Sequence, residues 1–262
     1  RITHYGLLMK GLLSVLYREY RFRITNITFL FWDIFVPITY LLIFGYGFQR
    51  SIGSSFHTAG YGNDYASFFL AGVLSMTCFS IAMNTSWRYF TERENGIFYE
   101  VLTYPVSRQQ LVAGKILFNV VLSLAGAVLA ILSGELFMNV EIQRSTLIWT
   151  MLAIGFGTAG WFFFFAILAL RMRRIDSFNT VTSICYILLM FASSLFYPLE
   201  NLPSWFRICA RLNPVTWQTD VLRFTTLGVG DLSVVLWESA AFAIFTTITF
   251  FAAVKALNHA GE

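Results

Sequence analysis

The sequence has 262 residues, of which 57% are hydrophobic and only 12% charged, and its formal net charge at pH 7 is +4. Because ordinary soluble domains carry about 25% charged residues, this composition disfavours a soluble protein and indicates one that resides in a membrane. The three cysteines are far apart, a spacing that suits neither a disulfide framework nor a metal site. We expect no cleavable signal peptide, since the first residues are basic and amphipathic and do not form a short apolar core before small residues.

The first predicted element is an amphipathic helix within residues 1–26. Lys10, Ser14, Arg18 and Arg21 fall on one helical stripe, and leucines take the other side. A basic amphipathic helix of this kind lies in the membrane interface and does not cross the bilayer. A core helix of a soluble domain would have a similar pattern, but the apolar runs that follow disfavour that interpretation.

Six apolar runs follow, each close to the roughly 20 residues that a bilayer-spanning helix needs. They lie near residues 27–48, 66–87, 113–137, 147–170, 178–197 and 233–256. The sequence therefore predicts an all-α integral membrane protein with six transmembrane helices. Because no repeat or linker divides it, we expect residues 1–262 to form a single transmembrane domain, with the six-span bundle in 27–257.

The distribution of basic residues predicts the orientation. Eleven Lys and Arg residues fall in segments 1–26, 88–112 and 171–177, whereas the connections on the alternate side hold five. Since cytoplasmic loops of membrane proteins are enriched in Lys and Arg, we expect the N-terminus in the cytoplasm. An even number of spans then places the C-terminus there too.

The most informative hydrophilic stretch is 88–108, between the second and third runs. Its charged side chains must lie in water or against another protein; they include Glu92, Arg93, Glu94 and Glu100. Glu92, Gly96 and Glu100 recur every four residues and would share one face of a helix, which Pro105 would end. The stretch predicts a short amphipathic helix parallel to the membrane. A solvated loop that only keeps two span ends in water is the competing interpretation.

The segment 198–232, between the fifth and sixth runs, is too long for a turn and too apolar for a tail. Three prolines punctuate it: Pro198, Pro203 and Pro214. Trp205–Leu212 and Val215–Phe224 mix apolar and polar residues at helical spacing. We expect two short helices that dip into the outer leaflet, with Trp205 and Trp217 as interfacial anchors.

Charged residues within the runs are costly in a bilayer and usually face protein or water. Asp33 lies about two helical turns inside the first run, and Lys115 or Arg23 can partner it. We favour a structural ion pair over a contact with a transported substrate.

Two glycine motifs resemble nucleotide-binding sequences but lack the neighbouring residues or elements that such sites need. Gly114-Lys115 lacks the upstream glycine of a phosphate loop, and Gly155-Phe-Gly157-Thr-Ala-Gly160 lies inside an uncharged run with no strand before it. Small residues four apart indicate instead that helices approach closely there. We therefore expect no nucleotide, cofactor or metal site in this chain; if ATP drives it, another chain binds the ATP.

The stretch Glu92-Arg93-Glu94-Asn95-Gly96, with Glu100-Val-Leu, Tyr104-Pro105-Val-Ser-Arg108 and Gly114-Lys115, resembles the cytoplasmic signature of type-2 ATP-binding-cassette (ABC) exporter permeases. The segment 198–232 is similar to that family's external re-entrant helices. The residues that carry this second similarity are Pro198, Pro203, Trp205, Asn213, Pro214 and Trp217. The motifs occur in the family's order and on the predicted sides of the membrane.

The resemblance implies a permease subunit in the cytoplasmic (inner) membrane that works with two copies of an ATPase subunit, which bind ATP and Mg²⁺. It also implies a second permease, giving a homodimer among membrane lipids, and no nucleic acid. The transmitting residues would be Glu92, Arg93, Glu94, Gly96 and Glu100 of a coupling helix, with the N-terminal helix as a second contact.

The resemblance leaves the cargo open between two classes. Lipo-oligosaccharide exporters and hydrophobic-drug exporters share this layout, and we favour an amphipathic lipid-linked or glycosylated product over a drug-like molecule. An ion-coupled carrier without an ATPase would predict internal symmetry and paired charges near the midplane, neither of which is evident. A membrane-embedded hydrolase lacks its catalytic constellation.

Overall fold

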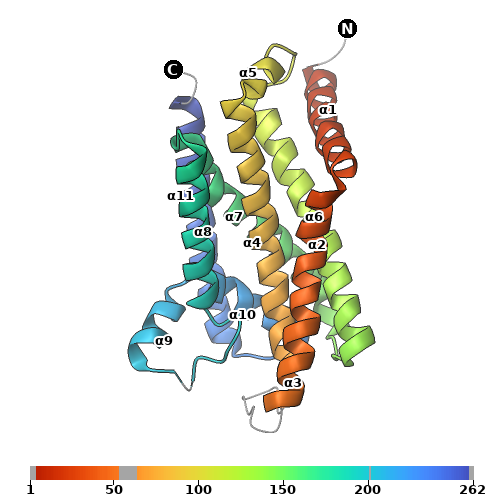
Figure 1. The fold of residues 1–262 in the computed structure, drawn as a ribbon, viewed down its shortest axis with the longest axis vertical. Helices are drawn as coiled ribbons and strands as arrows, with labels where there is room; N and C mark the ends of the chain where they lie inside the picture. The colour runs from red at the N-terminus through yellow and green to blue at the C-terminus, as the bar shows by residue number, and fades with distance from the viewer. Residues whose placement is uncertain (1–3, 53–63, 201, 260–262) are drawn as a thin grey trace.

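The computed structural model describes residues 4–52, 64–200 and 202–259, and every regular element within these ranges is helical. Figure 1 shows an elongated bundle with the start of α1, α5 and the end of α11 at one end, and α3 and α9 toward the other. We call these the α5 end and the α9 end. The elements are α1 His4–Thr25, α2 Ile27–Tyr40, the π-helical turn η1 Leu41–Gly45, α3 Tyr46–Ile52, α4 Tyr65–Glu94, α5 Ile97–Val101, α6 Arg108–Met138, the 3₁₀ turn η2 Arg144–Thr146, α7 Leu147–Arg171, α8 Ile175–Phe191, α9 Ser204–Arg211, α10 Pro214–Leu227 and α11 Leu232–His259.

Within the described ranges, five helical segments are long and apolar enough to cross a membrane. They are Ile27–Gln49, Tyr65–Glu94, Arg108–Met138, Arg144–Arg171 and Leu232–Asn258. These segments cover the first, second, third, fourth and sixth predicted runs. The all-helical architecture is therefore confirmed, and the difference between prediction and structure lies in the fifth run.

The predicted fifth span, 178–197, ends earlier than expected. Its helix, α8, has 17 residues and ends at Phe191, so it is shorter than the five spanning segments. Asn213 explains this end, because its Nδ2 donates hydrogen bonds to the carbonyl oxygens of Leu189 at 2.7 Å and Ala192 at 2.8 Å. Carbonyls at a helix end have no partner within the helix. A side chain that is 24 residues away in the sequence thus stops α8.

Helix α4 lies at the centre of the bundle and packs against α2, α6, α7 and α10. Its membrane-length stretch is 83% buried, as expected for a helix that is apolar on all sides. The ring of Phe79 lies 4.7 Å from that of Trp161 and 4.9 Å from that of Phe165, both on α7. The core of the protein therefore surrounds α4.

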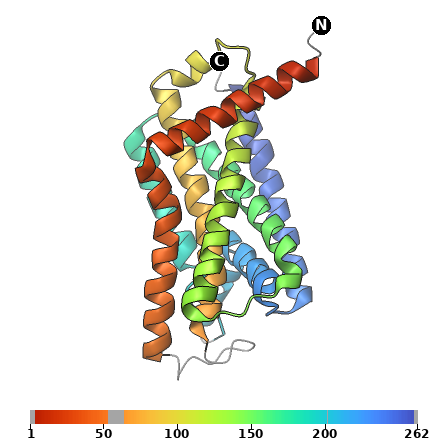
Figure 2. The same cartoon turned by 90° about the vertical axis from the view of Figure 1, so that its right-hand side faces the viewer.

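Helix α1 lies across the α5 end of the bundle and meets α2 at a bend at Asn26 (Figure 2). Leu13 and Tyr17 point outward, and each is more than half exposed. The inner side of α1 crosses α6 so closely that a Cβ atom at Gly114 would lie 2.5 Å from Cγ1 of Val15. An interfacial helix requires this arrangement, with its axis across the bundle and apolar side chains outward.

The glycines of α7 lie at close helix contacts, which confirms the packing interpretation of that motif. A Cβ atom at Gly157 would lie 2.2 Å from Nε2 of Gln218 on α10. A Cβ atom at Gly160 would lie 2.5 Å from Oγ1 of Thr246 on α11. Glycine at these two positions lets α10 and α11 pack directly on the α7 backbone.

We expect Gly157→Ala to lower the free energy of unfolding by about 1–3 kcal/mol, because the added methyl group must displace the Gln218 amide. The matched control is Gly47→Ala in α3, where an added Cβ meets no atom within 4 Å. Alanine favours a helix more than glycine does, so the control should be neutral or slightly stabilising. Thermal unfolding of both variants in one detergent tests this, and equal midpoints would contradict the close packing.

Candidate coupling site and transport cavities

The stretch between the second and third spans forms two helices with a break between them. α4 continues through Glu94, and Gly96, with φ of +76°, separates it from the short helix α5. Glycine adopts this left-handed backbone without a steric penalty. The prediction that Glu92, Gly96 and Glu100 share one helical face is therefore wrong, because the break leaves Glu92 on α4 and Glu100 on α5.

The five residues of this stretch with a predicted role differ in their surroundings. Glu94, Gly96 and Glu100 are exposed at the α5 end. Arg93 is partly buried, and its guanidinium donates to two carbonyl oxygens at the end of α7. Glu92 is only 8% exposed. The expectation that Glu92 lies in water or against another protein is therefore wrong.

Glu92 belongs to a set of charged residues, the charge cluster, which we define as Arg18, Glu19, Arg88, Glu92 and Lys115; Arg18 is partly exposed and the other four are buried. The Glu92 carboxylate lies 2.9 Å from Nη2 of Arg18 and 2.8 Å from Nζ of Lys115. The Glu19 carboxylate lies 2.7 Å from Nη2 of Arg88 and 2.9 Å from Nζ of Lys115. Because Arg18 and Glu19 are on α1, Arg88 and Glu92 on α4 and Lys115 on α6, the cluster ties three helices together.

The charge cluster keeps the Glu19 carboxylate ionised. Burial by itself would raise the pKa of Glu19, but the adjacent charges of Lys115 and Arg88 lower this pKa to about 2. Ion pairs of this kind are what permit charges to be buried. Gly114 and Lys115 together dock α1 onto α6, the first by admitting Val15 and the second by reaching Glu19.

Asp33 lies beside the charge cluster and pairs with Arg23, one of the two partners that the sequence suggested. Its other carboxylate oxygen accepts a hydrogen bond from Nδ2 of Asn84 at 2.7 Å. Arg23 also donates to Oγ1 of Thr85 at 3.0 Å, and Thr85 donates to Oδ1 of Asn119 at 2.6 Å. This chain of contacts joins the bend between α1 and α2 to the centres of α4 and α6.

A cavity of about 550 Å³ lies between α1 and the region around α5. Lys10, Ser14 and Arg18 line it from α1, and Glu100 and Tyr104 line it from the other side. The predicted coupling helix and the amphipathic N-terminal helix therefore form the two walls of one groove.

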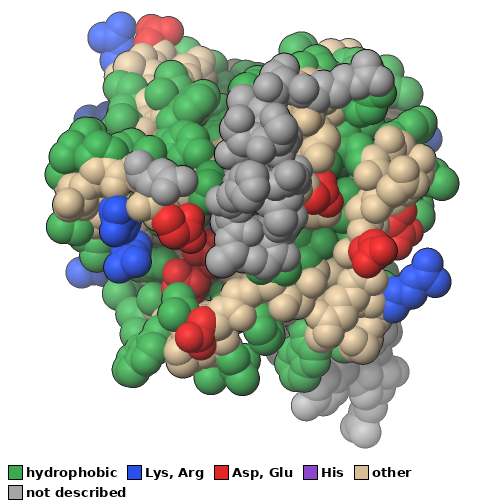
Figure 3. Space-filling view, turned by 90° about the horizontal axis from the view of Figure 1, so that it is seen from below, with side chains coloured by type: hydrophobic (Ala, Val, Ile, Leu, Met, Phe, Trp, Pro, Cys, Tyr) green, Lys and Arg blue, Asp and Glu red, His purple; other side chains and the backbone are tan. Residues whose placement is uncertain are grey.

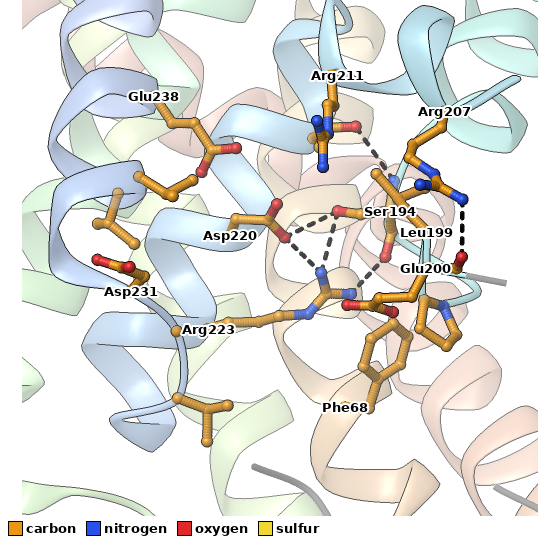
Figure 4. Close-up of a pocket in the computed structure, with 16 residues that line it drawn as sticks. Phe68, Ser194, Leu199, Glu200, Arg207, Arg211, Asp220, Arg223, Asp231 and Glu238 are labelled. Atoms are coloured by element: carbon orange, nitrogen blue, oxygen red, sulfur yellow. Dashed lines mark hydrogen bonds and ion pairs between the residues drawn. The ribbon is translucent and has the colours of Figure 1, made fainter. Parts of the chain in front are cut away.

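A second cavity, the polar cavity, has a volume of about 350 Å³ and lies toward the α9 end (Figure 4). Its charged lining residues are Glu200, Arg207, Arg211, Asp220, Arg223, Asp231 and Glu238. The guanidinium of Arg223 lies 2.5 Å from the Asp220 carboxylate, donates to Oγ of Ser194 at 3.0 Å and lies 3.9 Å above the Phe68 ring. Figure 3 shows charged side chains at this end in a few places among hydrophobic ones.

Six predicted site residues lie in the connection between α8 and α11: Pro198, Pro203, Trp205, Asn213, Pro214 and Trp217. Pro203 precedes α9 and Pro214 is the first residue of α10, positions that suit proline. Asn213 also caps α10, since its Oδ1 accepts the N–H of Val215 at 2.9 Å. Trp205 is exposed, whereas Nε1 of Trp217 donates to a backbone carbonyl at the end of α9. Pro198 lines the polar cavity.

A third cavity, the apolar cavity, lies between α7, α10 and α11 and has a volume of about 800 Å³. Most of its lining side chains are apolar, among them Trp149, Phe156, Phe224 and Phe242. Val235 lines both the polar and the apolar cavity, so the two are neighbours. The hydrophobic periodicity of the sequence did not reveal either cavity. For the polar cavity, the sequence did contain one signal, which is the i,i+3 spacing of Asp220 and Arg223.

Among the residues that the structure describes, no group of three His, Cys, Asp or Glu side chains is placed to hold a metal ion. Asp231 and Asp33 lie in different parts of the bundle, since Asp231 precedes α11 at the α9 end and Asp33 pairs with α1. A membrane-embedded aspartyl hydrolase would need two carboxylates that face each other, and these two do not.

The family model of ABC-2 type transporters matches residues 11–227. A putative transport permease, ycf38, of Cyanophora paradoxa is 29% identical over 198 residues, which cover 73% of this chain and 65% of that protein. The daunorubicin resistance ABC transporter permease DrrB1 of Streptomyces coeruleorubidus is 26% identical over 228 residues, covering 82% of this chain and 76% of that protein. The chain thus spans about two thirds of the length of the ycf38 protein. It belongs to the ABC-2 type transporter family.

Proposed function

We propose that this chain is the membrane-spanning permease of an ATP-driven exporter whose ATPase is a separate subunit. The observation that carries the proposal is the groove between α1 and α5, which Glu100 lines, together with Glu94, which is exposed at the same end of the bundle. Charged side chains that are exposed at the end of an apolar bundle suit contact with a soluble partner. ATP and Mg²⁺ would be bound by that partner.

The charge cluster supports a route for the motion. Closure of the ATPase dimer on ATP would move α5, and Arg93 and Glu92 connect the adjoining end of α4 to α7, α1 and α6. A short turn at Gly96 joins α5 to α4, and ion pairs and hydrogen bonds join α4 to α1, α6 and α7, so the bundle moves with α5 in this proposal. In this proposal Glu94, Gly96 and Glu100 contact the ATPase, and Glu92 and Arg93 act inside the permease.

The assembly that we propose contains two identical permeases and two ATPase subunits in the cytoplasmic membrane. Each permease has six spans, with α8 as the fifth, and the α5 end faces the cytoplasm with both termini. The Lys and Arg excess of the connections at that end supports this orientation. In the same proposal α9 and α10 are re-entrant helices, and the buried face of α10 supports that assignment.

The two neighbouring cavities support an amphipathic cargo. The polar cavity offers charges of both signs, and the apolar cavity beside it offers aromatic walls. A molecule with a polar head and an apolar body would contact both across Val235. We propose a lipid-linked or glycosylated product as this cargo.

A hydrophobic drug or antibiotic is the second candidate cargo. The similarity to a daunorubicin resistance permease, which extends over 82% of this chain, favours it. The size of the apolar cavity favours it too, since drug-sized ligands occupy pockets of about 300–1,000 Å³.

Purification of the tagged chain from its native membrane tests the proposed function. We expect an ATPase subunit with a phosphate loop to co-purify, and its ATP hydrolysis to drive uptake of cargo into inside-out vesicles. Uptake that follows an ion gradient and persists without ATP would contradict the proposal and support an ion-coupled carrier.

A further inference from the structure

Part of the charge around the polar cavity is already paired within the protein. The guanidinium of Arg223 pairs with the Asp220 carboxylate, and Oγ of Ser194 donates to the same carboxylate oxygen at 2.9 Å. Because both contacts use Oδ1 of Asp220, its Oδ2 has no hydrogen-bond partner in the described part of the chain. Figure 4 shows this second oxygen directed toward the space between Arg211 and Glu238. The cavity therefore keeps one carboxylate oxygen that a ligand can use.

The other five charged side chains of the lining form no ion pair with any residue that the structure describes. They are Glu200, Arg207, Arg211, Asp231 and Glu238. Arg207 and Arg211 lie on α9, whereas Asp231 precedes α11 and Glu238 lies in its second turn, so the two sides of the cavity in Figure 4 differ in charge. A purely anionic ligand would meet the unpaired carboxyl groups, and a purely cationic one would meet the guanidinium groups. The cavity therefore suits a ligand that carries one charge of each sign.

Arg211 and Glu238 offer the free contacts for such a ligand. Neither side chain makes a hydrogen bond within the described ranges, although Asp220, Arg223 and Arg211 are the charges near the Glu238 carboxyl group. Arg211 is exposed and Glu238 is partly exposed, so a ligand can reach both. Guanidinium groups bind phosphate and carboxylate through paired N–H donors. The negative group of a ligand thus fits Arg211, and its positive group fits Glu238 and Oδ2 of Asp220.

The lining also indicates which kind of positive group fits. Quaternary ammonium groups are recognised by open aromatic faces. Phe68 is the aromatic side chain of this lining, and the guanidinium of Arg223 already lies 3.9 Å above its ring. A primary ammonium group instead donates hydrogen bonds to carboxyl oxygens, which Asp220 and Glu238 supply. The positive group is therefore a primary ammonium.

The position of the polar cavity indicates a lipid as the source of these charges. The membrane-length helix Leu232–Asn258 has 27 residues. It is therefore about 40 Å long, against a hydrocarbon core of about 30 Å, so its first turns reach the level of the lipid headgroups. Val235 joins the polar cavity to the apolar cavity, and Trp149 and Leu236 of the apolar lining are more than half exposed on the surface of the bundle. The headgroup and an acyl chain of one lipid fit these neighbouring cavities.

We propose that the polar cavity binds the headgroup of a phospholipid that carries a primary ammonium group, with its phosphate on Arg211 and its ammonium on Asp220 and Glu238. This site goes beyond the proposed export function, because the lipid belongs to the surrounding membrane and its binding requires no ATPase. A cargo that enters the polar cavity would compete with this lipid.

Native mass spectrometry of the purified full chain tests the site with three lipids that share the same acyl chains. Phosphatidylethanolamine carries the phosphate and the primary ammonium, phosphatidylcholine carries the phosphate and a quaternary ammonium, and phosphatidylglycerol carries the phosphate alone. We expect half-saturation by phosphatidylethanolamine at a concentration about tenfold lower than by the other two, because hydrogen bonds with charged groups form only with its ammonium.

Two variants separate the two ends of the headgroup. Glu238→Gln should weaken phosphatidylethanolamine about tenfold and leave phosphatidylcholine nearly unchanged, because only the first donates to the carboxyl group. Arg211→Gln should weaken all three lipids, since each has a phosphate. The matched controls are Glu141→Gln and Arg144→Gln, exposed residues outside the cavity lining, which should change no affinity. Both test variants should keep the natural thermal midpoint, because neither side chain holds a bond within the described fold.

The remaining outcomes are also decisive. Equal affinity of the natural chain for the three lipids, or a preference for phosphatidylethanolamine that survives Glu238→Gln, would overturn the proposal. Free phosphoethanolamine has the same charges without acyl chains, so it should bind at least about tenfold more weakly than the lipid. If it bound as tightly as the lipid, the cavity would belong to a soluble zwitterion and the lipid assignment would be wrong. Because the measurement involves no transport, its result does not depend on whether the chain exports a cargo.

Discussion

Glu19→Gln should lower the free energy of unfolding by about 3–5 kcal/mol, the cost of removing one partner from a buried ion pair. Glu19 is fully buried, and its carboxylate is shared by Arg88 and Lys115. Without it, the three cations of the charge cluster face the single carboxylate of Glu92. The decrease is measurable as a lower thermal unfolding midpoint, together with detachment of α1 seen as faster proteolysis after residues 18–23.

Two comparisons isolate the charge from the side-chain shape. Glu141→Gln changes an exposed glutamate toward the α9 end and should have almost no effect. The double variant Glu19→Leu with Lys115→Met removes one charge of each sign and should recover much of the loss, because apolar side chains often replace a buried pair without cost. A double variant no more stable than Glu19→Gln would show that charge balance is not what holds α1.

Lowering the pH should destabilise the fold through protonation of the same carboxylate. The pKa of Glu19 is lowered from its ordinary value of 4.5 to about 2, because Lys115 and Arg88 outweigh the opposing effect of burial. A group with a lowered folded-state pKa stabilises the fold fully above its ordinary pKa, and its contribution disappears as the pH falls toward the folded value. The natural chain should therefore lose stability between about pH 4.5 and pH 2, and Glu19→Gln should lose less over that window.

The sequence predicted the features that depend on local patterns. Runs of apolar residues located the spans, because a helix must carry about 20 of them to cross a bilayer. Prolines located the beginnings of the two short helices α9 and α10, whereas the helix break at Gly96 was not predicted. The end of α8 was not predictable in this way, because a distant side chain, Asn213, determines it.

Whether a charged side chain is buried or exposed was harder to predict than the positions of the spans. Charge alone placed Glu92 in water, whereas Arg18, Arg88 and Lys115 gather around it in the fold. Arg88 lies four residues before Glu92 on α4, a spacing that the sequence shows, but Arg18 and Lys115 lie on α1 and α6, and no spacing within one segment reveals them. A glutamate near a membrane interface is exposed unless cations from other segments reach it, and that depends on how α1 crosses α6.

Glu94→Lys or Glu100→Lys should reduce ATP-dependent export at least tenfold while ATP hydrolysis by the partner continues. These two glutamates are exposed at the α5 end, on either side of the break at Gly96. Reversal of a charge in a contact between proteins places like charges together and costs several kcal/mol, which corresponds to more than tenfold in an equilibrium constant. Export into inside-out vesicles and ATP hydrolysis are measured on the same preparation.

The charge cluster supplies the control that separates coupling from folding. Glu94→Lys and Glu100→Lys should keep the natural thermal midpoint, since neither side chain is buried. Glu92→Lys should lower that midpoint, because the ion pairs of Glu92 with Arg18 and Lys115 are replaced by repulsion between like charges. Glu141→Lys at the other end should change neither export nor stability. Normal export by both Glu94→Lys and Glu100→Lys would mean that the partner engages a different surface, and α1 would then be the next surface to test.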